Sequence, residues 1–242
     1  MKGSYDVHVH STHSGGISTL SEMIKMAHRL GHQSICLSDF GAIDPSQVES
    51  LLKECKGFTP TVYSRADISP KTPRELSHKL NYIRRKVDLV AVECSSENVC
   101  RFASTNRFMD ILTLAPTAKA SVFTELVARN CSKNGIALEI TLIPFIRYYG
   151  KVRAKLLRMW RKILAVALRN NVMFAIGTGA LSKYELRGSR EMLLLAKLVG
   201  LPQDLAKQSL IETPFKLIER RILERNGKII IPGVRIIDEE KD

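Results

Sequence analysis

The sequence predicts an α/β protein in which about seven parallel strands form a barrel surrounded by about eight to ten helices. Seven short runs are rich in β-branched or apolar residues, and each is followed by a stretch with helical periodicity. Such alternation is typical of parallel strands joined by helical crossovers, in a barrel or in an open, doubly wound sheet. The spacing of roughly 25–35 residues per strand–helix unit favours the barrel.

The expected elements follow in order along the chain. The expected strands are residues 5–9, 33–38, 61–68, 88–94, 110–114, 136–141 and 172–177. The first helix is expected to have Ser18 as its N-cap and to stop at Gly31. The third begins after Thr72, with Pro73 at the first helical position, where a missing N–H costs nothing.

After Gly177 the pattern changes to helices only, and no linker, repeat or low-complexity segment divides the chain. The 242 residues, 45% of them hydrophobic, suit one core. We therefore expect residues 1–225 to form a single βα-barrel domain. Residues 226–242 form a C-terminal tail that either adds a strand or hairpin or is partly disordered.

Several classes of protein are disfavoured by what the sequence lacks. It has no apolar run of membrane-spanning length and no N-terminal secretory signal, so a cytoplasmic protein without a membrane partner is expected. Neither a dinucleotide-binding GxGxxG nor a P-loop motif is present. The five cysteines include no CxxC pair, which favours buried, reduced thiols over a disulfide framework or zinc knuckle.

The stretch "YDVHVHSTHSGG" places three histidines within six positions. On a strand, His8 and His10 share a face, and at a barrel mouth two imidazoles could bind a metal ion. A residual one-metal site of His8, His10 and either Asp39 or Glu93 stays open. All six histidines lie at or before residue 78, and the last strand ends in "IGTGA" without a carboxylate. We therefore expect polar packing at the mouth, with no catalytic residue, metal or cofactor.

Positive charge is the strongest signal in the sequence. The net charge is +13, from 37 Lys and Arg against 24 Asp and Glu, which indicates a polyanionic partner such as nucleic acid. Residues 147–171 hold eight Lys or Arg and no acid, with basic and apolar residues on separate stripes of one helix. Such a ridge suits backbone phosphates, whereas docking on a membrane surface or a protein is the weaker alternative.

Shorter basic clusters occur at residues 84–86 and in "SKYELRGSR", and Arg65 is expected to reach the loop face of the barrel. The candidate RNA-binding residues are Arg65, Arg84, Arg85, Lys86, Lys151, Lys155, Arg158, Lys162, Lys183, Arg187 and Arg190.

The pattern H-x-H-S-x-x-S resembles the first motif of the polymerase-and-histidinol-phosphatase (PHP) domain. That resemblance implies a seven-stranded βα barrel whose metal cluster hydrolyses phosphoesters. Later motifs differ: Phe40 follows Asp39 where histidine is expected, and Arg65 and Asp67 stand where the family has glutamate. A PHP-type metal-dependent phosphoesterase using His8 and His10 is therefore the alternative interpretation.

Two longer stretches carry further motifs. Residues 62–114 carry "SRADI", a Pro-x-Glu-Leu helix start, "DLVAVE", "RFA" and "DIL", and residues 176–201 carry "GALSKYELRGSRE". Both stretches resemble the RNase P thirty-kilodalton subunit family, which includes archaeal ribonuclease P protein component 3, with Thr178 where serine is usual. The resemblance implies a PHP-like barrel with degenerate metal motifs.

The same resemblance implies the partners and the activity. The protein would bind RNase P RNA together with other protein subunits, one of them a close partner in a heterodimer or heterotetramer. It would support removal of the 5′ leader from precursor tRNA. The RNA would carry catalysis, so the isolated chain is not expected to be catalytic.

Overall fold

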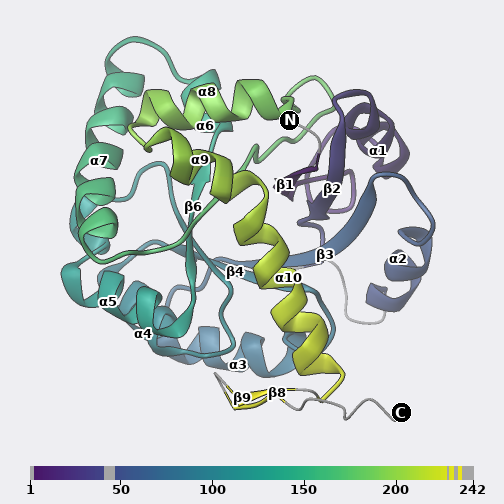
Figure 1. The fold of residues 1–242 in the computed structure, drawn as a ribbon, viewed down its shortest axis with the longest axis horizontal. Coiled ribbons are helices and arrows are strands. Elements are labelled where there is room, and N and C mark those ends of the chain that lie inside the picture. Colours follow the sequence, from purple (N-terminus) through teal and green to yellow (C-terminus); the bar gives the residue numbers. More distant parts are fainter. Residues whose placement is uncertain (1–2, 41–46, 228, 232–233, 236–242) are drawn as a thin grey trace, which may run out of the picture.

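Seven parallel strands form one sheet in chain order, as the computed structural model shows for the described residues 3–40, 47–227, 229–231 and 234–235 (Figure 1). The strands are β1 (Ser4–Val9), β2 (His32–Leu37), β3 (Thr61–Ile68), β4 (Leu89–Cys94), β5 (Ile111–Leu114), β6 (Ala137–Thr141) and β7 (Phe174–Gly177). The sheet curls until the segment after β7 meets β1. There the His10 N–H donates to the Ala180 carbonyl at 2.9 Å, and the Gly179 N–H donates to the His8 carbonyl at 2.8 Å. The predicted barrel is confirmed.

Helices surround the barrel and connect its strands (Figure 1). They are α1 (Leu20–Arg29), α2 (Val48–Glu54), α3 (Pro73–Ile83), α4 (Glu97–Thr105), the 3₁₀ turn η1 (Ala120–Val122), α5 (Glu125–Asn134), α6 (Ile143–Arg147), α7 (Gly150–Arg169), α8 (Ser189–Val199), α9 (Gln203–Leu210) and α10 (Glu212–Arg225). No helix of the described residues is long and apolar enough to cross a membrane. The five cysteines are buried and free, as expected.

Local sequence signals explain where the helices begin. Helix α1 is capped by Thr19 rather than the expected Ser18, because Thr19 and Glu22 form a reciprocal capping box. Helix α3 begins as predicted, with the Thr72 hydroxyl accepting the Glu75 N–H and Pro73 at the first position.

Two apolar clusters lie on opposite faces of the strands. The larger packs Val90, Leu112 and Leu138 against the helices. The smaller combines strand residues with two side chains of α10: Tyr5, Val7, Cys36, Leu89, Ala91, Ile111, Ala137, Ala175, Leu217 and Ile218. Because its members alternate along each strand with those of the larger cluster, the smaller one fills the barrel interior. Helix α10 thus closes the end of the barrel where the strands begin.

Beyond α10, β8 (Ile229–Ile231) pairs antiparallel with β9 (Val234–Arg235). Within the predicted tail of residues 226–242, Pro232, Gly233 and residues 236–242 lie outside the described residues. The expected division at residue 225 remains a prediction.

Candidate functional site at the barrel mouth

The barrel interior changes from apolar to charged toward the carboxyl ends of the strands. On strands β4, β5 and β6, the residue two positions after the interior apolar residue is polar: Glu93 follows Ala91, Thr113 follows Ile111, and Glu139 follows Ala137. Strand β3 adds Arg65 and Asp67 to this layer. In βα barrels this end carries the active site. The polar layer is therefore the candidate functional site.

A β-bulge turns His8 into this layer. Asp6 pairs with Ile35 and Val9 pairs with Leu37, so two residues of β1 oppose one of β2. Val7 packs in the interior cluster and Val9 in the outer one, whereas His8 contacts interior charged groups. His8 and His10 both line the cavity at the barrel mouth, so the prediction that they share a face is confirmed.

Two glycines of "IGTGA" make room for this arrangement. A Cβ on Gly177 would lie 2.4 Å from the Cβ of His8 and 3.2 Å from Glu139 Oε1. Gly179 has a φ of +66°, and a Cβ there would lie 2.5 Å from Thr141 Cγ2. In the sequence these glycines were noted only because they supply no metal-binding side chain. In the structure they let the backbone after β7 come close to His8 and Thr141.

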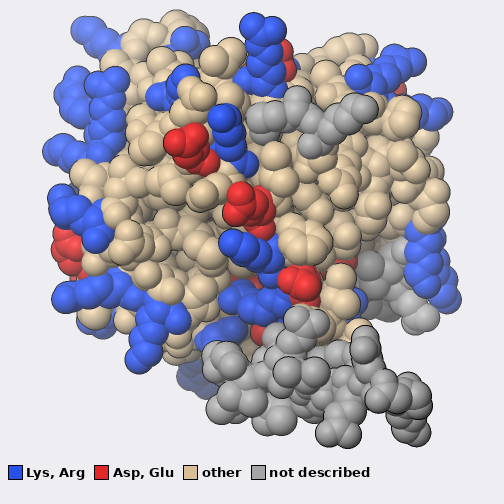
Figure 2. Space-filling view, in the orientation of Figure 1, with Lys and Arg blue, Asp and Glu red and all other residues tan. Residues whose placement is uncertain are grey.

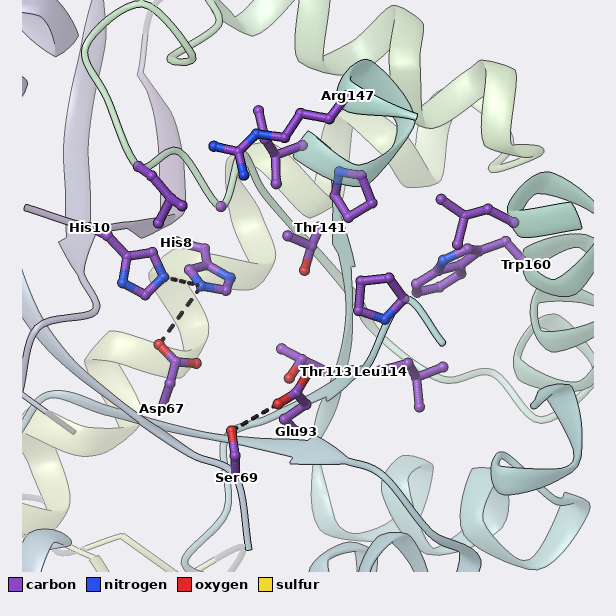
Figure 3. Close-up of a pocket in the computed structure, with 16 residues that line it drawn as sticks. His8, His10, Asp67, Ser69, Glu93, Thr113, Leu114, Thr141, Arg147 and Trp160 are labelled. Carbon is purple, nitrogen blue, oxygen red and sulfur yellow. Dashed lines mark hydrogen bonds and ion pairs between the residues drawn. The ribbon is translucent and has the colours of Figure 1, made fainter. Parts of the chain in front are cut away.

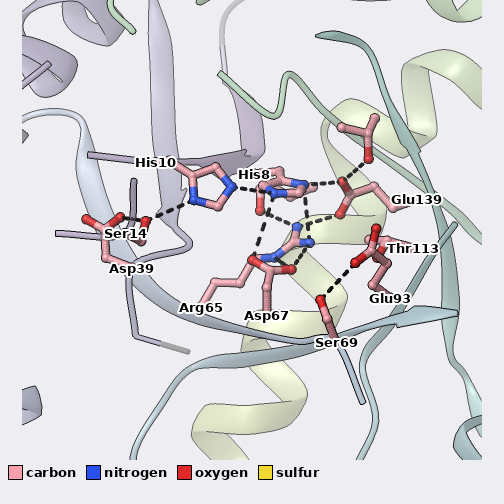
Figure 4. A network of polar contacts seen from close by, with 12 residues as sticks. His8, His10, Ser14, Asp39, Arg65, Asp67, Ser69, Glu93, Thr113 and Glu139 are labelled. Carbon is pink, nitrogen blue, oxygen red and sulfur yellow. Dashed lines mark hydrogen bonds and ion pairs between the residues drawn. The ribbon is translucent and has the colours of Figure 1, made fainter. Parts of the chain in front are cut away.

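Arg65 is the centre of a buried ionic network (Figure 4). Its guanidinium donates to Glu139 Oε2 at 2.5 Å, to Asp67 Oδ1 at 2.7 Å and to the Val7 carbonyl at 2.6 Å. Glu139 Oε1 lies 2.6 Å from His8 Nδ1. These contacts satisfy the Arg65 charge inside the barrel, where an unpaired charge would be costly.

The network sets the protonation of its members. Burial opposes ionisation of Asp67, but Arg65 and then His8 outweigh it and hold the pKa of that carboxyl at about 2. Burial and Arg65 lower the pKa of His8, yet Glu139 and Asp67 bring the pKa above its usual value. Burial and the adjacent His8 ring lower the pKa of His10 to about 4. At neutral pH the site therefore holds ionised carboxylates and a neutral His10.

A cavity of about 280 Å³ opens beside the two histidines (Figure 3). His8, His10 and Asp67 stand along one wall, and Glu93 and Thr113 stand along another. Helix α7 contributes Leu156 and Trp160 to the lining. Trp160 is 3% exposed and packs in the core, so its ring is not available for stacking on a base.

The structure corrects three sequence predictions about the site. Arg65 and Arg84, expected to contact RNA, are buried and ion-paired, Arg84 with Asp110 at 2.6 Å. In this conformation both guanidinium groups are bound to buried carboxylates. Asp39 was expected beside His8 and His10, but its carboxylate accepts hydrogen bonds from the backbone N–H and the hydroxyl of Ser11. The carboxylate beside the two histidines is that of Asp67.

Helix α7 presents the expected basic ridge. Lys151, Lys155, Arg158 and Lys162 are exposed, and Lys and Arg gather along the edge of the molecule where α7 lies (Figure 2). The buried face consists of Leu156, Trp160, Ile163, Leu164 and Ala167. Val152, an apolar residue in the first turn of the helix, is 54% exposed and does not join this face. The ridge is available for a partner, and its contact with RNA stays a prediction.

The other candidate residues do not join this ridge. Lys183 donates to Glu22 at 2.6 Å, and the Arg187 guanidinium is held by the Tyr184 and Leu186 carbonyls. Arg190 is exposed in the first turn of α8.

Exposed Arg85 and half-buried Lys86 lie in the segment before β4, at the end where the strands begin. The segment of residues 183–190 follows β7, at the opposite end of the parallel barrel. The predicted residues thus occupy several surfaces rather than one.

Comparison with known proteins gives a consistent result. The family model described as RNase P subunit p30 matches residues 3–226. Ribonuclease P protein component 3 of Methanococcoides burtonii is 30% identical over 236 residues, 97% of this chain and 94% of that protein. The relative of the same description from Methanothermobacter thermautotrophicus is 28% identical, with 97% of this chain and 96% of that protein covered.

A solved structure shares the fold along the whole chain. A chain of a cryo-EM structure of archaeal ribonuclease P with mature tRNA aligns with a TM-score of 0.78 and 22% identity. The alignment covers 98% of this chain and 100% of that chain. At this identity the likeness supports the fold.

Proposed function

Because the chain belongs to the RNase P subunit p30 family, we propose that it is a protein subunit of ribonuclease P. In this role it binds the catalytic RNA together with a second protein subunit and supports removal of the 5′ leader from precursor tRNA. The observation that carries the proposal is similarity along 97% of the chain to a relative named ribonuclease P protein component 3. The chain acts within a cytoplasmic ribonucleoprotein, and catalysis resides in the RNA.

The basic ridge of α7 supports a role in binding RNA. Each phosphate neutralised by Lys or Arg releases condensed counterions, so affinity falls steeply as salt rises. Lys151, Lys155, Arg158 and Lys162 project from one rigid helix, which keeps their spacing fixed along a phosphate backbone. Lys and Arg side chains remain cationic at neutral pH. The ridge is our first candidate for the RNA surface.

The donor set at the barrel mouth disfavours the alternative, a phosphoesterase with several metal ions. Such chemistry needs two ions held by shared carboxylates. Here Arg65 occupies Glu139 Oε2 and Asp67 Oδ1, which removes these oxygens from metal binding. Within the described residues, His8, His10 and Asp67 are the one group of three potential ligands that converges.

The relatives and the solved complex also support the proposed partners. The matching structure is a complex of archaeal ribonuclease P with mature tRNA. We propose that the partners of the present chain are RNase P RNA, precursor tRNA within the holoenzyme, and other protein subunits. One of these subunits is a close partner in a heterodimer or heterotetramer.

A reconstitution experiment tests the proposal. RNase P RNA and the partner subunits are assayed for cleavage of precursor tRNA with and without this chain, over a range of salt concentrations. We expect the chain to stimulate cleavage and to bind RNA with a steep salt dependence. Stimulation absent in every subunit combination, or RNA-independent turnover that His8→Ala abolishes, would overturn the proposal in favour of a phosphoesterase.

A charge-reversal variant tests the ridge itself. Changing Lys151, Lys155, Arg158 and Lys162 to Glu should weaken RNA binding and reduce the slope of log affinity against log salt by roughly 3. The matched control reverses four exposed lysines on other helices and loops, namely Lys25, Lys71, Lys133 and Lys207. Equal losses in both variants would show that net charge, and not the ridge, determines binding.

A further inference from the structure

A wide cleft lies at the end of the barrel where the strands begin, opposite the mouth. It has a volume of about 790 Å³ and is formed by the end of α3, the turn before β5 and the last turns of α10 (Figure 1). Its lining includes five arginines and a single acid, Glu224. The arginines are Arg84, Arg85, Arg107, Arg221 and Arg225. The cleft and its charge do not depend on the proposed role in ribonuclease P.

The inner part of the cleft is built from arginines whose positions are fixed. Arg84, which is 4% exposed, donates to Asp110 at 2.6 Å and to Glu224 at 3.0 Å. Arg221, which is 6% exposed, also contacts Glu224 and donates to the Arg84 carbonyl at 2.6 Å. Because these guanidinium groups are held from several sides, the cleft is preformed, and a ligand does not have to order it.

Positive charge in the cleft exceeds the negative charge that reaches it. Five arginines line it against one acid, and two further carboxylates pair with these arginines from outside the lining. Arg85 and Arg107 are exposed, and neither forms an ion pair with a described residue. The buried Nε atoms of Arg84 and Arg221 also have no hydrogen-bond partner among the described residues. An anion bound in the cleft would compensate this excess, and the planar fork of arginine suits carboxylate and phosphate alike.

The aromatic ring of the cleft disfavours a nucleic acid as the source of that anion. A nucleobase stacks on an open aromatic face. The Phe108 ring instead lies 5.0 Å from the Arg107 guanidinium and 5.8 Å from that of Arg84, measured to the ring centroid. The carboxylate of Glu224, whose side chain is 27% exposed, would also repel a chain of phosphates.

Exposed apolar side chains beside the cleft favour a protein instead. Phe108 is 38% exposed in the cleft itself. Ile222, which is 41% exposed, directly follows Arg221 on α10, and Tyr82, which is 44% exposed, precedes the end of α3 by one residue. Arginines and aromatic residues that together line a concave surface are typical of the centre of protein interfaces.

We propose that this cleft binds an acidic segment of another protein in which carboxylates stand beside apolar side chains. The carboxylates of the segment pair with Arg85 and Arg107, and its apolar side chains pack against Phe108 and Ile222. Charge complementarity selects this occupant, since each inner arginine is already neutralised and the two outer arginines are not. Arg85, predicted from the sequence to contact RNA, binds a protein carboxylate in this proposal.

The test measures binding of a fluorescein-labelled hexapeptide of glutamate and leucine to the full chain by fluorescence anisotropy. We expect saturable binding to wild type. Binding to the double variant Arg85→Glu, Arg107→Glu should be at least about tenfold weaker. The matched control makes the same charge change at two exposed arginines of other helices, Arg29 and Arg190. It should keep the wild-type affinity within about twofold at physiological salt, because distant surface charges are screened.

A second measurement locates the peptide and reports on folding. The Nε–H groups of Arg84 and Arg221 are shielded from solvent, and their signals in ¹⁵N spectra should shift when the peptide is added to wild type or to the control. The same signals show whether the double variant keeps the cleft intact. Absence of saturable binding, or equal loss in both variants, overturns the proposal. Displacement of the peptide by equimolar inorganic phosphate or oligouridylate also overturns it, and assigns the cleft to simple anions or to RNA.

Discussion

Asp110 holds the closed end of the barrel together through three arginines, and its removal should destabilise the fold strongly. The carboxylate is fully buried and accepts from Arg84 at 2.6 Å and from Arg220 at 2.7 Å. Arg221 Nε lies 3.8 Å away. The same carboxylate also accepts the Val90 N–H at 2.8 Å. The cluster links the end of α3 and helix α10 to the strands, so Asp110→Ala leaves three cations without their common partner.

The expected magnitude follows from burial. The side chains of Arg84 and Arg221 are 5% and 7% exposed, whereas Arg220 is 24% exposed and partly screened by water. Removing one partner from a buried ion pair costs about 3–5 kcal/mol. Glu224 still contacts Arg84 and Arg221, so we expect a value near the lower end, about 3–4 kcal/mol. For a chain of this size the melting temperature should fall by roughly 6–16 °C.

Thermal denaturation followed by circular dichroism at pH 7 measures this effect. The control is Asp204→Ala, which removes a carboxylate that is 91% exposed and 3.9 Å from Lys207. Such a contact is worth little, so the control should shift the melting temperature by less than about 2 °C. If Asp110→Ala shifts it no more than the control does, the ionic cluster does not stabilise the fold and the reasoning is refuted.

Three further predictions concern the pH dependence, the barrel mouth and the barrel interior. Burial opposes ionisation of Asp110, but its arginines outweigh burial and lower the pKa of the carboxyl. The difference in unfolding free energy between wild type and Asp110→Ala should therefore be full at neutral pH and shrink below about pH 4, where the carboxyl of the unfolded chain first takes up a proton. Urea titrations at several pH values measure this difference. Gly177→Ala should lower the unfolding free energy measured in urea by about 3 kcal/mol or more, because the new Cβ collides with His8. The control Gly188→Ala should cost much less, because its new Cβ meets the flexible end of Glu191. Equal costs would contradict the close approach of Gly177 to His8. Leu217→Ala should lower the unfolding free energy by about 2–5 kcal/mol in the same measurement, because the side chain is 1% exposed inside the barrel. A loss below about 1 kcal/mol would show that α10 does not close this end of the barrel.

The local sequence determined most of the elements of this fold. All seven strands lie within two residues of the expected bounds, because β-branched runs between turn signals mark strands without reference to distant residues. Thr72 and Pro73 marked the start of α3 for the same reason, since capping depends on neighbours in the chain. The exposed ridge of α7 followed from helical periodicity alone.

Tertiary structure decided which charged residues are buried. Arg65 is a basic residue at a strand end, and the sequence treats it like Lys183 or Arg187. Only closure of the barrel brings Glu139 of β6 within 2.5 Å of it, across 74 positions of the chain. Periodicity tells that residues share a face, but it does not tell which face becomes the interior or what lies opposite.

The same limit applies to the histidines. That His8 and His10 share a face was predictable from their spacing, and the bulge that places Val7 and His8 together on the interior was not. Asp39 and Asp67 both stand near strand ends in the sequence, and only the paired register of β1, β2 and β3 shows that Asp67 faces the two rings. Spacing along the chain determines which side a residue faces, whereas the convergence of these three side chains depends on distances through space that only the closed barrel sets.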